Sequence, residues 1–134
     1  MESLVEVNSS FWHGKSVFLT GHTGFKGGWL SFWLAQMGAD VCGYSLNPPS
    51  DPALFDVAGI KMELAADTRA DLADLVALKA ALKAANPDVI FHLAAQAIVR
   101  DSYTNPLSTF ATNIMGTANL LEAAREVDSV RAIV

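Results

Sequence analysis

A short apolar segment that ends at a series of glycines constrains the fold of this chain more than any other feature. Residues 16–20, Ser-Val-Phe-Leu-Thr, carry the β-branched and aromatic side chains of a buried strand. Gly21, Gly24 and Gly27 follow, and the apolar stretch 25–37 predicts a buried helix. Glycines permit a tight turn, a close approach of backbone to ligand, and close packing of helix on sheet. The segment therefore predicts a strand–loop–helix unit with free amides where its helix begins.

Strands and helices alternate in the prediction for the rest of the chain. Patterns of apolar residues predict strands at 40–44, 62–66, 89–93 and 130–134, and helices at 52–58, 71–85 and from 105 to about 127. This alternation is typical of parallel βαβ units, whose right-handed crossovers lead to the strand order 3-2-1-4-5. We therefore expect an α/β fold of the Rossmann type, with helices on both faces of the sheet and one domain over residues 1–134. A ligand is expected between strands 1 and 4.

Composition excludes several classes of function. The 134 residues are 51% hydrophobic and carry 14 Asp+Glu against 9 Lys+Arg, a formal net charge of −5 that argues against nucleic acid as a partner. Residues 1–6 are acidic where a signal peptide is basic, and no apolar stretch has the length of a membrane span. We therefore expect a cytoplasmic protein without a membrane partner. Cys42 is expected to be a reduced core residue, and the histidines and cysteine lack metal-ligand spacing.

The glycine loop has the spacing of a dinucleotide-binding loop. A P-loop is excluded, because no Gly-Lys-Ser/Thr follows at the required offset. The acid that usually ends the second strand and holds the ribose hydroxyls is missing, and residues 44–47, Tyr-Ser-Leu-Asn, stand there instead. No arginine that would bind a ribose phosphate lies in that segment either, although Lys26 supplies a positive charge within the loop. The choice between NAD and NADP therefore stays open from the residues alone.

Several polar side chains near the expected crevice are candidates for ligand contacts. Asp67, with Thr68, follows the expected third strand and is either an adenine contact or a solvated loop carboxylate. His22 either contacts a phosphate or is a polar loop residue, and His92 is either a hydrogen-bonded core histidine or a ligand contact. Asn113 lies within a predicted helix despite its low helix propensity, which indicates a role beyond the helix itself.

Four motifs together resemble the extended short-chain dehydrogenase/reductases that act on nucleotide sugars, and in particular the 4,6-dehydratases among them. The motifs are the glycine loop Thr-Gly-His-Thr-Gly-Phe-Lys-Gly at 20–27, Asp67, His-Leu-Ala-Ala-Gln at 92–96, and Thr-Asn-Ile-Met-Gly-Thr at 112–117. The resemblance implies NAD as cofactor and a nucleotide sugar, CDP-glucose, as substrate. It also implies the reaction of a lyase: hydride leaves C4 for NAD, water is eliminated across C5 and C6, and the hydride returns to C6.

The resemblance also implies which residues contact the cofactor. The glycine loop would hold the pyrophosphate, the residues after the third strand the adenine, and the residues after the fourth strand the ribose and the nicotinamide. A helix asparagine would organise the catalytic region. The residues in these positions are Gly21, Thr23, Gly24, Phe25, Lys26 and Gly27 in the loop, Tyr44 on the second strand, Asp67 and Thr68, then Leu93, Ala94, Ala95 and Gln96, and Asn113.

Two features of such enzymes are missing from this sequence. The family carries a Ser/Thr after the fifth strand and a Tyr-x-x-x-Lys beyond it, but neither Tyr44 nor Tyr103 has a lysine four residues later. We therefore expect the chain to be the first part of a longer enzyme, inactive alone, with exposed apolar surface that favours homo-oligomers. The alternatives are a non-catalytic dinucleotide-binding module and an epimerase or reductase of the same superfamily.

Overall fold

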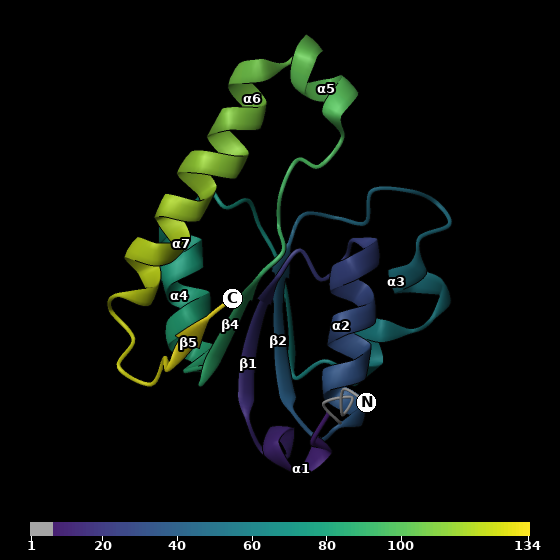
Figure 1. Ribbon diagram of the computed structural model, residues 1–134, viewed down its shortest axis with the longest axis vertical. Coiled ribbons are helices and arrows are strands. Elements are labelled where there is room, and N and C mark those ends of the chain that lie inside the picture. The colour runs from purple at the N-terminus through teal and green to yellow at the C-terminus, as the bar shows by residue number, and fades with distance from the viewer. Residues whose placement is uncertain (1–6) are drawn as a thin grey trace, which may run out of the picture.

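The elements of the chain are given by a computed structural model that describes residues 7–134 (Figure 1). Among these residues no helix is both long and apolar enough to cross a membrane. The acidic residues 1–6 of the sequence prediction lie outside the described part. In chain order the elements are α1 (Ser9–Trp12), β1 (Ser16–Thr20), α2 (Phe25–Gln36), β2 (Asp40–Ser45), α3 (Leu54–Val57), a 3-10 turn (Ile60–Glu63), β3 (Ala66–Arg69), α4 (Leu75–Ala85), β4 (Val89–His92), α5 (Val99–Thr104), α6 (Pro106–Phe110), a π-helical turn (Ala111–Met115), α7 (Gly116–Ala124) and β5 (Ala132–Ile133).

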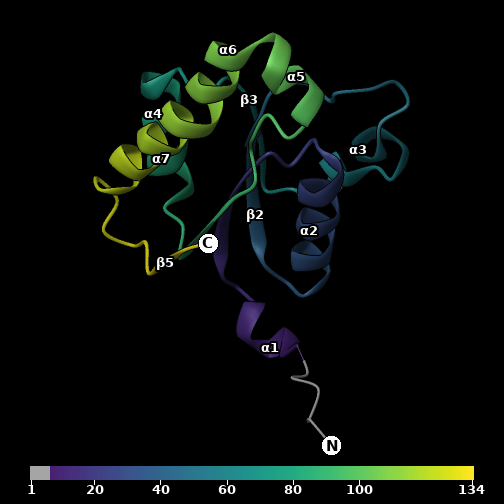
Figure 2. The same ribbon diagram turned by 45° about the horizontal axis from the view of Figure 1, so that its top comes forward.

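The five strands form one parallel sheet in the order β3-β2-β1-β4-β5. Helices α2 and α3 lie on one side of the sheet and α4 and α7 on the other, as both views show (Figures 1 and 2). The central strand β1 has its Phe18 beside Cys42 of β2 and beside Ile90 of β4. The predicted Rossmann-type fold and its strand order are confirmed.

Each face of the sheet has its own hydrophobic core. Successive β1 side chains point to opposite faces, so that Phe18 packs with Leu78 of α4 and Leu120 of α7. Val17 and Leu19 of the same strand point the other way and belong to the core that contains Leu34 of α2. Because both faces are covered, the strand is apolar along most of its length, as its sequence predicted.

The third strand lies elsewhere than predicted. It spans Ala66–Arg69, whereas the sequence pattern placed it at 62–66, and Met62 belongs to the preceding 3-10 turn with most of its surface exposed. β3 is an edge strand with polar side chains, two of which, Asp67 and Arg69, form an ion pair. The search for apolar residues therefore favoured the wrong segment.

The α2 prediction was correct in extent but wrong in its burial. The buried residues of α2 are Gly27, Gly28, Ser31 and Leu34, while Trp29 and Trp33 are each 51% exposed. Small residues form the face that packs against the sheet and α3, so the large aromatic side chains point away from it.

The long helix expected from residue 105 to about 127 is present and runs without a break from Pro106 to Ala124, as α6, a π-helical turn and α7. Pro106 begins α6 as predicted, but Asn105 makes no side-chain cap bond, and the turn at 111–115 is π-helical. Helix α5 at 99–104 had no counterpart in the prediction. Helix α4 begins at Leu75 rather than at residue 71, because Asp74 caps it by accepting a hydrogen bond from the Ala77 amide at 2.9 Å.

Candidate functional site

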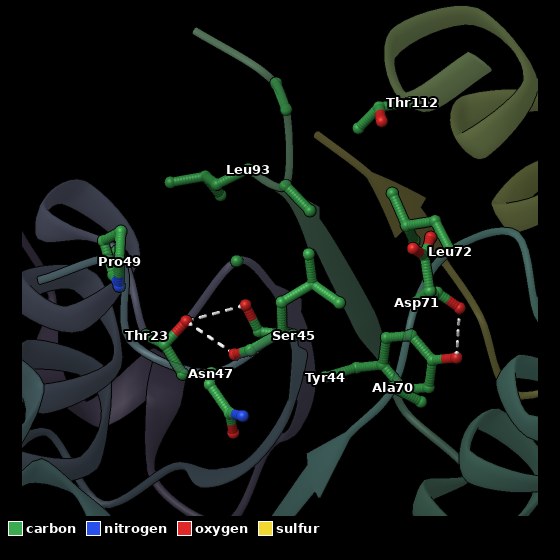
Figure 3. Close-up of a pocket in the computed structure, with 15 residues that line it drawn as sticks. Thr23, Tyr44, Ser45, Asn47, Pro49, Ala70, Asp71, Leu72, Leu93 and Thr112 are labelled. Atoms are coloured by element: carbon green, nitrogen blue, oxygen red, sulfur yellow. Dashed lines mark hydrogen bonds between the residues drawn. The ribbon is translucent and has the colours of Figure 1, made fainter. Parts of the chain in front are cut away.

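A cavity of about 250 Å³ opens at the carboxyl ends of the strands, where the sequence predicted a ligand (Figure 3). Four segments that are distant in sequence contribute to it: the loop after β1, the end of β2 with the loop that follows, the residues after β3, and the residues after β4. The lining residues are Gly21, Thr23, Gly24, Tyr44, Ser45, Leu46, Asn47, Pro49, Ala70, Asp71, Leu72, Leu93, Ala94, Ala95 and Thr112.

Two of the three loop glycines are required by the fold itself. Gly21 has a φ of +81°, and a Cβ on it would lie 2.8 Å from the backbone nitrogen of Ala94. A Cβ on Gly27 would lie 2.1 Å from the carbonyl oxygen of Gly21, so neither position accepts a side chain. The sequence analysis expected Gly27 to permit close packing of helix on sheet, whereas the close contact that requires glycine here is between the helix and the loop backbone.

Gly24 differs from both, because the protein itself leaves room for a side chain there. Its φ of −78° and ψ of 173° are extended values open to any residue. A Cβ on Gly24 would meet only the Gly21 carbonyl oxygen, at the ordinary contact distance of 3.4 Å. Gly24 lines the cavity and is the N-cap of α2, whose first turn carries no acidic residue. This position is thus open toward the cavity and bounded by the positive end of a helix dipole.

The end of β2 holds the glycine loop through hydroxyl groups (Figure 3). The Thr23 hydroxyl donates to the Leu46 carbonyl at 3.0 Å and lies 2.8 Å from the Ser45 hydroxyl. On the other side of β2, the fully buried Tyr44 donates its phenolic proton to the Asp71 carbonyl at 2.8 Å. Burial, with the nearby charges of Asp74 and Asp71, raises the pKa of Tyr44 to about 12, so the phenol stays protonated and keeps this bond.

The sequence analysis expected Asp67 to follow the third strand. It lies instead within β3 and outside the cavity lining. Its side chain is 11% exposed and accepts hydrogen bonds from His22 Nε2 and Arg69 Nε, each at 2.7 Å. Although burial raises the pKa of Asp67, these bonds hold it below its ordinary value. The acid that follows β3 and lines the cavity is Asp71, which the sequence analysis missed. The helix cap at Asp74 was the available signal, because a helix that begins at Leu75 instead of residue 71 leaves residues 70–73 as the loop after the strand.

His22 is a residue of the glycine loop whose side chain is fully buried, so it has no exposed surface with which to contact a phosphate. Burial lowers its pKa below the ordinary 6.5, although the bond to Asp67 acts in the opposite direction. The neutral ring donates from Nε2, because a carboxylate only accepts, and its Nδ1 has no hydrogen-bond partner among residues 7–134. The edge of the Phe55 ring completes the enclosure of the imidazole.

His92 belongs to a directed series of hydrogen bonds at the end of β4. The Thr117 hydroxyl donates to the Asn113 carbonyl, so it accepts from His92 Nε2 at 3.0 Å. His92 Nδ1 then accepts from the Thr20 hydroxyl at 2.7 Å, and that hydroxyl accepts from the Ala94 amide. Burial lowers the pKa of His92, which favours the neutral ring that this series requires. The interpretation of His92 as a hydrogen-bonded, partly buried histidine agrees with these contacts.

Asn113 holds the segment after β4 through a pair of hydrogen bonds. Its Oδ1 accepts from the Gln96 amide at 2.8 Å, and its Nδ2 donates to the Gln96 carbonyl at 3.0 Å. The asparagine lies in the π-helical turn, whose wider backbone carries it toward this segment. Asn113 and Gln96 thus fix the backbone beside the cavity without lining it.

Half of the residues predicted to bind a cofactor line the cavity, and half do not. Phe25 and Lys26 are exposed in the first turn of α2. The sequence analysis noted Ser45, Leu46 and Asn47 only as neutral substitutes for an acid, and Thr112 only as part of the motif at 112–117. It did not single out the other missed residues, Pro49, Ala70, Asp71 and Leu72. The predicted residues in the lining are Gly21, Thr23, Gly24, Tyr44, Leu93, Ala94 and Ala95, and those outside it are Phe25, Lys26, Gly27, Asp67, Thr68, Gln96 and Asn113.

The glycine loop, the parallel sheet and a cavity at its carboxyl edge define a Rossmann-type protein of the class that includes nucleotide-sugar epimerases and dehydratases. Residues 18–134 match the family described as GDP-mannose 4,6 dehydratase, and the chain belongs to that family. The resemblance stated from the sequence motifs is confirmed by this match.

Individual relatives agree with the family. The chain is 44% identical over 128 residues to CDP-glucose 4,6-dehydratase of Salmonella typhimurium, and the aligned residues cover 96% of this chain and 35% of that protein. It is 37% identical over 125 residues to UDP-glucuronate 4-epimerase 6 of Arabidopsis thaliana, and the aligned residues cover 91% of this chain and 27% of that protein. The chain thus spans about a third of the length of these relatives.

Solved structures show the same fold. The epimerase Mth375 of Methanothermobacter thermautotrophicus superposes with a TM-score of 0.77 at 28% identity, covering 93% of this chain and 35% of the other. A UDP-glucose-4-epimerase of Stenotrophomonas maltophila, determined with bound NAD, superposes with a TM-score of 0.74 at 27% identity. That match covers 89% of this chain and 35% of the epimerase.

Proposed function

We propose that this chain is the NAD-binding part of a nucleotide-sugar 4,6-dehydratase that acts on CDP-glucose. The observation that carries the proposal is Gly24, whose missing side chain serves no contact within the protein and leaves the start of α2 open to the cavity. Backbone amides at such a helix start bind phosphate groups. The 44% identity to a CDP-glucose 4,6-dehydratase supports the substrate, and the NAD-bound epimerase of the same fold supports the cofactor.

The residues around the cavity suit the parts of a dinucleotide. The loop from Gly21 to Gly27 would receive the pyrophosphate, and Leu93 to Ala95 would face the nicotinamide half. When bound, NAD accepts a hydride from the sugar and later returns it. The chain's own residues bind and orient: Thr23 and Tyr44 fix the loop and the segment after β3, and Asn113 fixes the segment after β4.

For the adenine we propose Asp71 and Leu72 in place of Asp67 and Thr68. Asp71 and Leu72 line the cavity directly after β3, whereas the Asp67 carboxylate is bonded to His22 and Arg69. The Asp71 backbone is held in position by the Tyr44 hydroxyl, so its place beside the cavity does not depend on the ligand.

The chain supplies binding rather than turnover in this proposal. Neither tyrosine of the sequence, Tyr44 or Tyr103, is followed by a lysine four residues later, and Tyr44 is buried with its proton committed to a carbonyl. The epimerase relatives keep a second function open, because the same cofactor-binding half serves 4-epimerases. A coding sequence that continues past residue 134 into a Tyr-x-x-x-Lys motif would support an enzyme. A coding sequence without that motif would favour a non-catalytic module.

Isothermal titration calorimetry of the 134-residue chain with NAD tests the binding proposal. We expect binding by the native chain and none by Gly24→Val, because the new side chain fills the space left for the pyrophosphate while the backbone accepts it. Ala84→Val, on the exposed face of α4, is the matched control and should bind like the native chain. Far-ultraviolet circular dichroism of each variant checks the fold. Unchanged affinity in Gly24→Val would place the phosphates elsewhere, and no heat with NAD or NADP at millimolar concentration would refute dinucleotide binding.

A further inference from the structure

The end of β2 lacks the acid that usually recognises the adenosine ribose in this fold. Ser45, Leu46 and Asn47 line the cavity at this place, and none of them carries a charge. In a dinucleotide site of this type, a carboxylate accepts a hydrogen bond from the ribose 2′-hydroxyl and repels the 2′-phosphate of NADP. Any selectivity at this site therefore has to come from neutral groups.

The hydroxyl groups of Thr23 and Ser45 make both of their hydrogen bonds in one arrangement of their protons. A hydroxyl group has a single proton to donate. The Thr23 hydroxyl donates its proton to the Leu46 carbonyl oxygen at 3.0 Å, because a carbonyl can only accept. The 2.8 Å contact between Thr23 Oγ1 and Ser45 Oγ then requires Ser45 to be the donor. Since the Ser45 proton is used inside the protein, the lone pairs of its oxygen are what remain for a ligand.

The charges around the cavity favour a ribose hydroxyl over a phosphate as well. Among the described lining residues, Asp71 is the only charged one, so the lining offers no cation to a third phosphate group. The nearest cation along the sheet is Arg69, the register partner of Ser45 on β3. Its guanidinium donates two hydrogen bonds to Asp67 and lies over the Phe55 ring. The charge of Arg69 is thus already paired.

Asn47 does not reverse this preference. Its side chain is exposed at the cavity, and an amide both donates and accepts, so it serves a hydroxyl and a phosphate alike. Ser45 is different, because its geometry permits only one of these two roles.

We propose that the Ser45 hydroxyl, with its proton held by Thr23, accepts a hydrogen bond from the adenosine ribose and makes this site selective for NAD over NADP. The inference rests on the proposed dinucleotide binding and names the residues that choose the dinucleotide. A phosphate oxygen placed against Ser45 would meet lone pairs, whereas a ribose hydroxyl donates to them. At the end of β2 the selectivity arises from the direction of a hydrogen bond, because none of the described residues that line the cavity at this place is charged.

Calorimetric titration of the chain with NAD and with NADP tests the proposal through the ratio of the two dissociation constants. The native chain should bind NAD roughly tenfold more tightly, about the effect of one hydrogen bond. Thr23→Val keeps the shape of the side chain but frees the Ser45 proton, so the ratio should fall toward one. Ser45→Ala should weaken NAD and leave NADP nearly unchanged, and Ser45→Asp should widen the ratio beyond that of the native chain.

Ser50→Ala is the matched control, because Ser50 is an exposed serine of the following loop that bonds only to the Pro52 carbonyl. It should leave the ratio unchanged. Equal binding of both dinucleotides by the native chain, or a ratio that Thr23→Val and Ser45→Ala do not alter, would overturn the proposal. Absence of binding by either dinucleotide would instead refute the proposed function, and this inference with it. Should Thr23→Val fail to fold, the two Ser45 variants decide the matter.

Discussion

The contact between Gly43 and His22 allows a quantitative test of how the glycine loop is supported. Gly43 lies in β2 under the His22 ring, and a Cβ added to it would lie 2.4 Å from His22 Cγ. Ordinary contacts begin at 3.4 Å, so the added methyl group is about 1 Å too close. The ring cannot move away easily, because it is fully buried, bonded to Asp67 at 2.7 Å and packed against the Phe55 ring.

The expected cost of Gly43→Ala follows from two opposing effects. Overpacking a well-filled core costs about 1–3 kcal/mol. Replacing a strand glycine by alanine returns roughly 0.5–1 kcal/mol, because glycine loses more conformational freedom on folding. We therefore expect Gly43→Ala to lower the free energy of unfolding by about 1 kcal/mol, within a range of about 0–2.5 kcal/mol. His22→Ala alone also destabilises, because it leaves a cavity and removes one donor from Asp67.

In the double variant the new methyl group enters the space that the imidazole has left. The double variant should therefore lose less free energy of unfolding than the two single variants lose in sum. We expect a coupling energy of at least about 1 kcal/mol. The four proteins are compared by urea unfolding, followed by circular dichroism at about pH 8, where histidine is neutral. Costs that add to within about 0.5 kcal/mol would show that Gly43 and His22 do not compete for the same space, and would refute this account of the loop.

Two further predictions concern pH and association. Burial lowers the pKa of both His22 and His92 below the ordinary 6.5, so the unfolded chain takes up protons that the folded chain does not. The free energy of unfolding from urea titrations should be constant between about pH 7 and 8 and fall between about pH 6.5 and 5; a flat profile would contradict this. Ile114 and Leu121 are 59% and 50% exposed, so light scattering should show self-association that Leu121→Glu weakens. A monomer at high concentration in the native chain would argue against it.

The sequence predicted the fold well where burial of apolar side chains determines the structure. Strands β1, β2 and β4 are buried by helices on one or both faces, and their apolar or β-branched residues indicate this directly. β3 was misplaced because its residues are held by pairing with β2 and by the ion pair of Asp67 with Arg69, neither of which produces an apolar pattern. The π-helical turn at 111–115 escaped prediction for a similar reason, since its bonds to Gln96 are tertiary.

The candidate site likewise contains residues that the sequence could predict and residues that it could not. The glycine loop was predictable because the positive φ of Gly21 and the contact of Gly27 with the Gly21 carbonyl oxygen both arise within the loop. The residues after β3 were missed because their identification depended on where that strand ends. The role of His22 could not be predicted either, because it depends on Asp67, which is 45 residues away in the sequence and is brought near by the sheet.

The contact of Gly21 with the segment after β4 has a consequence for how such a site changes over time. A Cβ on Gly21 would lie 2.8 Å from the Ala94 nitrogen and 2.9 Å from the Leu93 carbonyl carbon, so peptide groups of two segments meet directly at the floor of the cavity. Mutation replaces side chains and leaves peptide groups as they are. The rim, where Ser45 and Asp71 lie, therefore has side chains that substitution can change, whereas the floor at Gly21 has no room for any side chain.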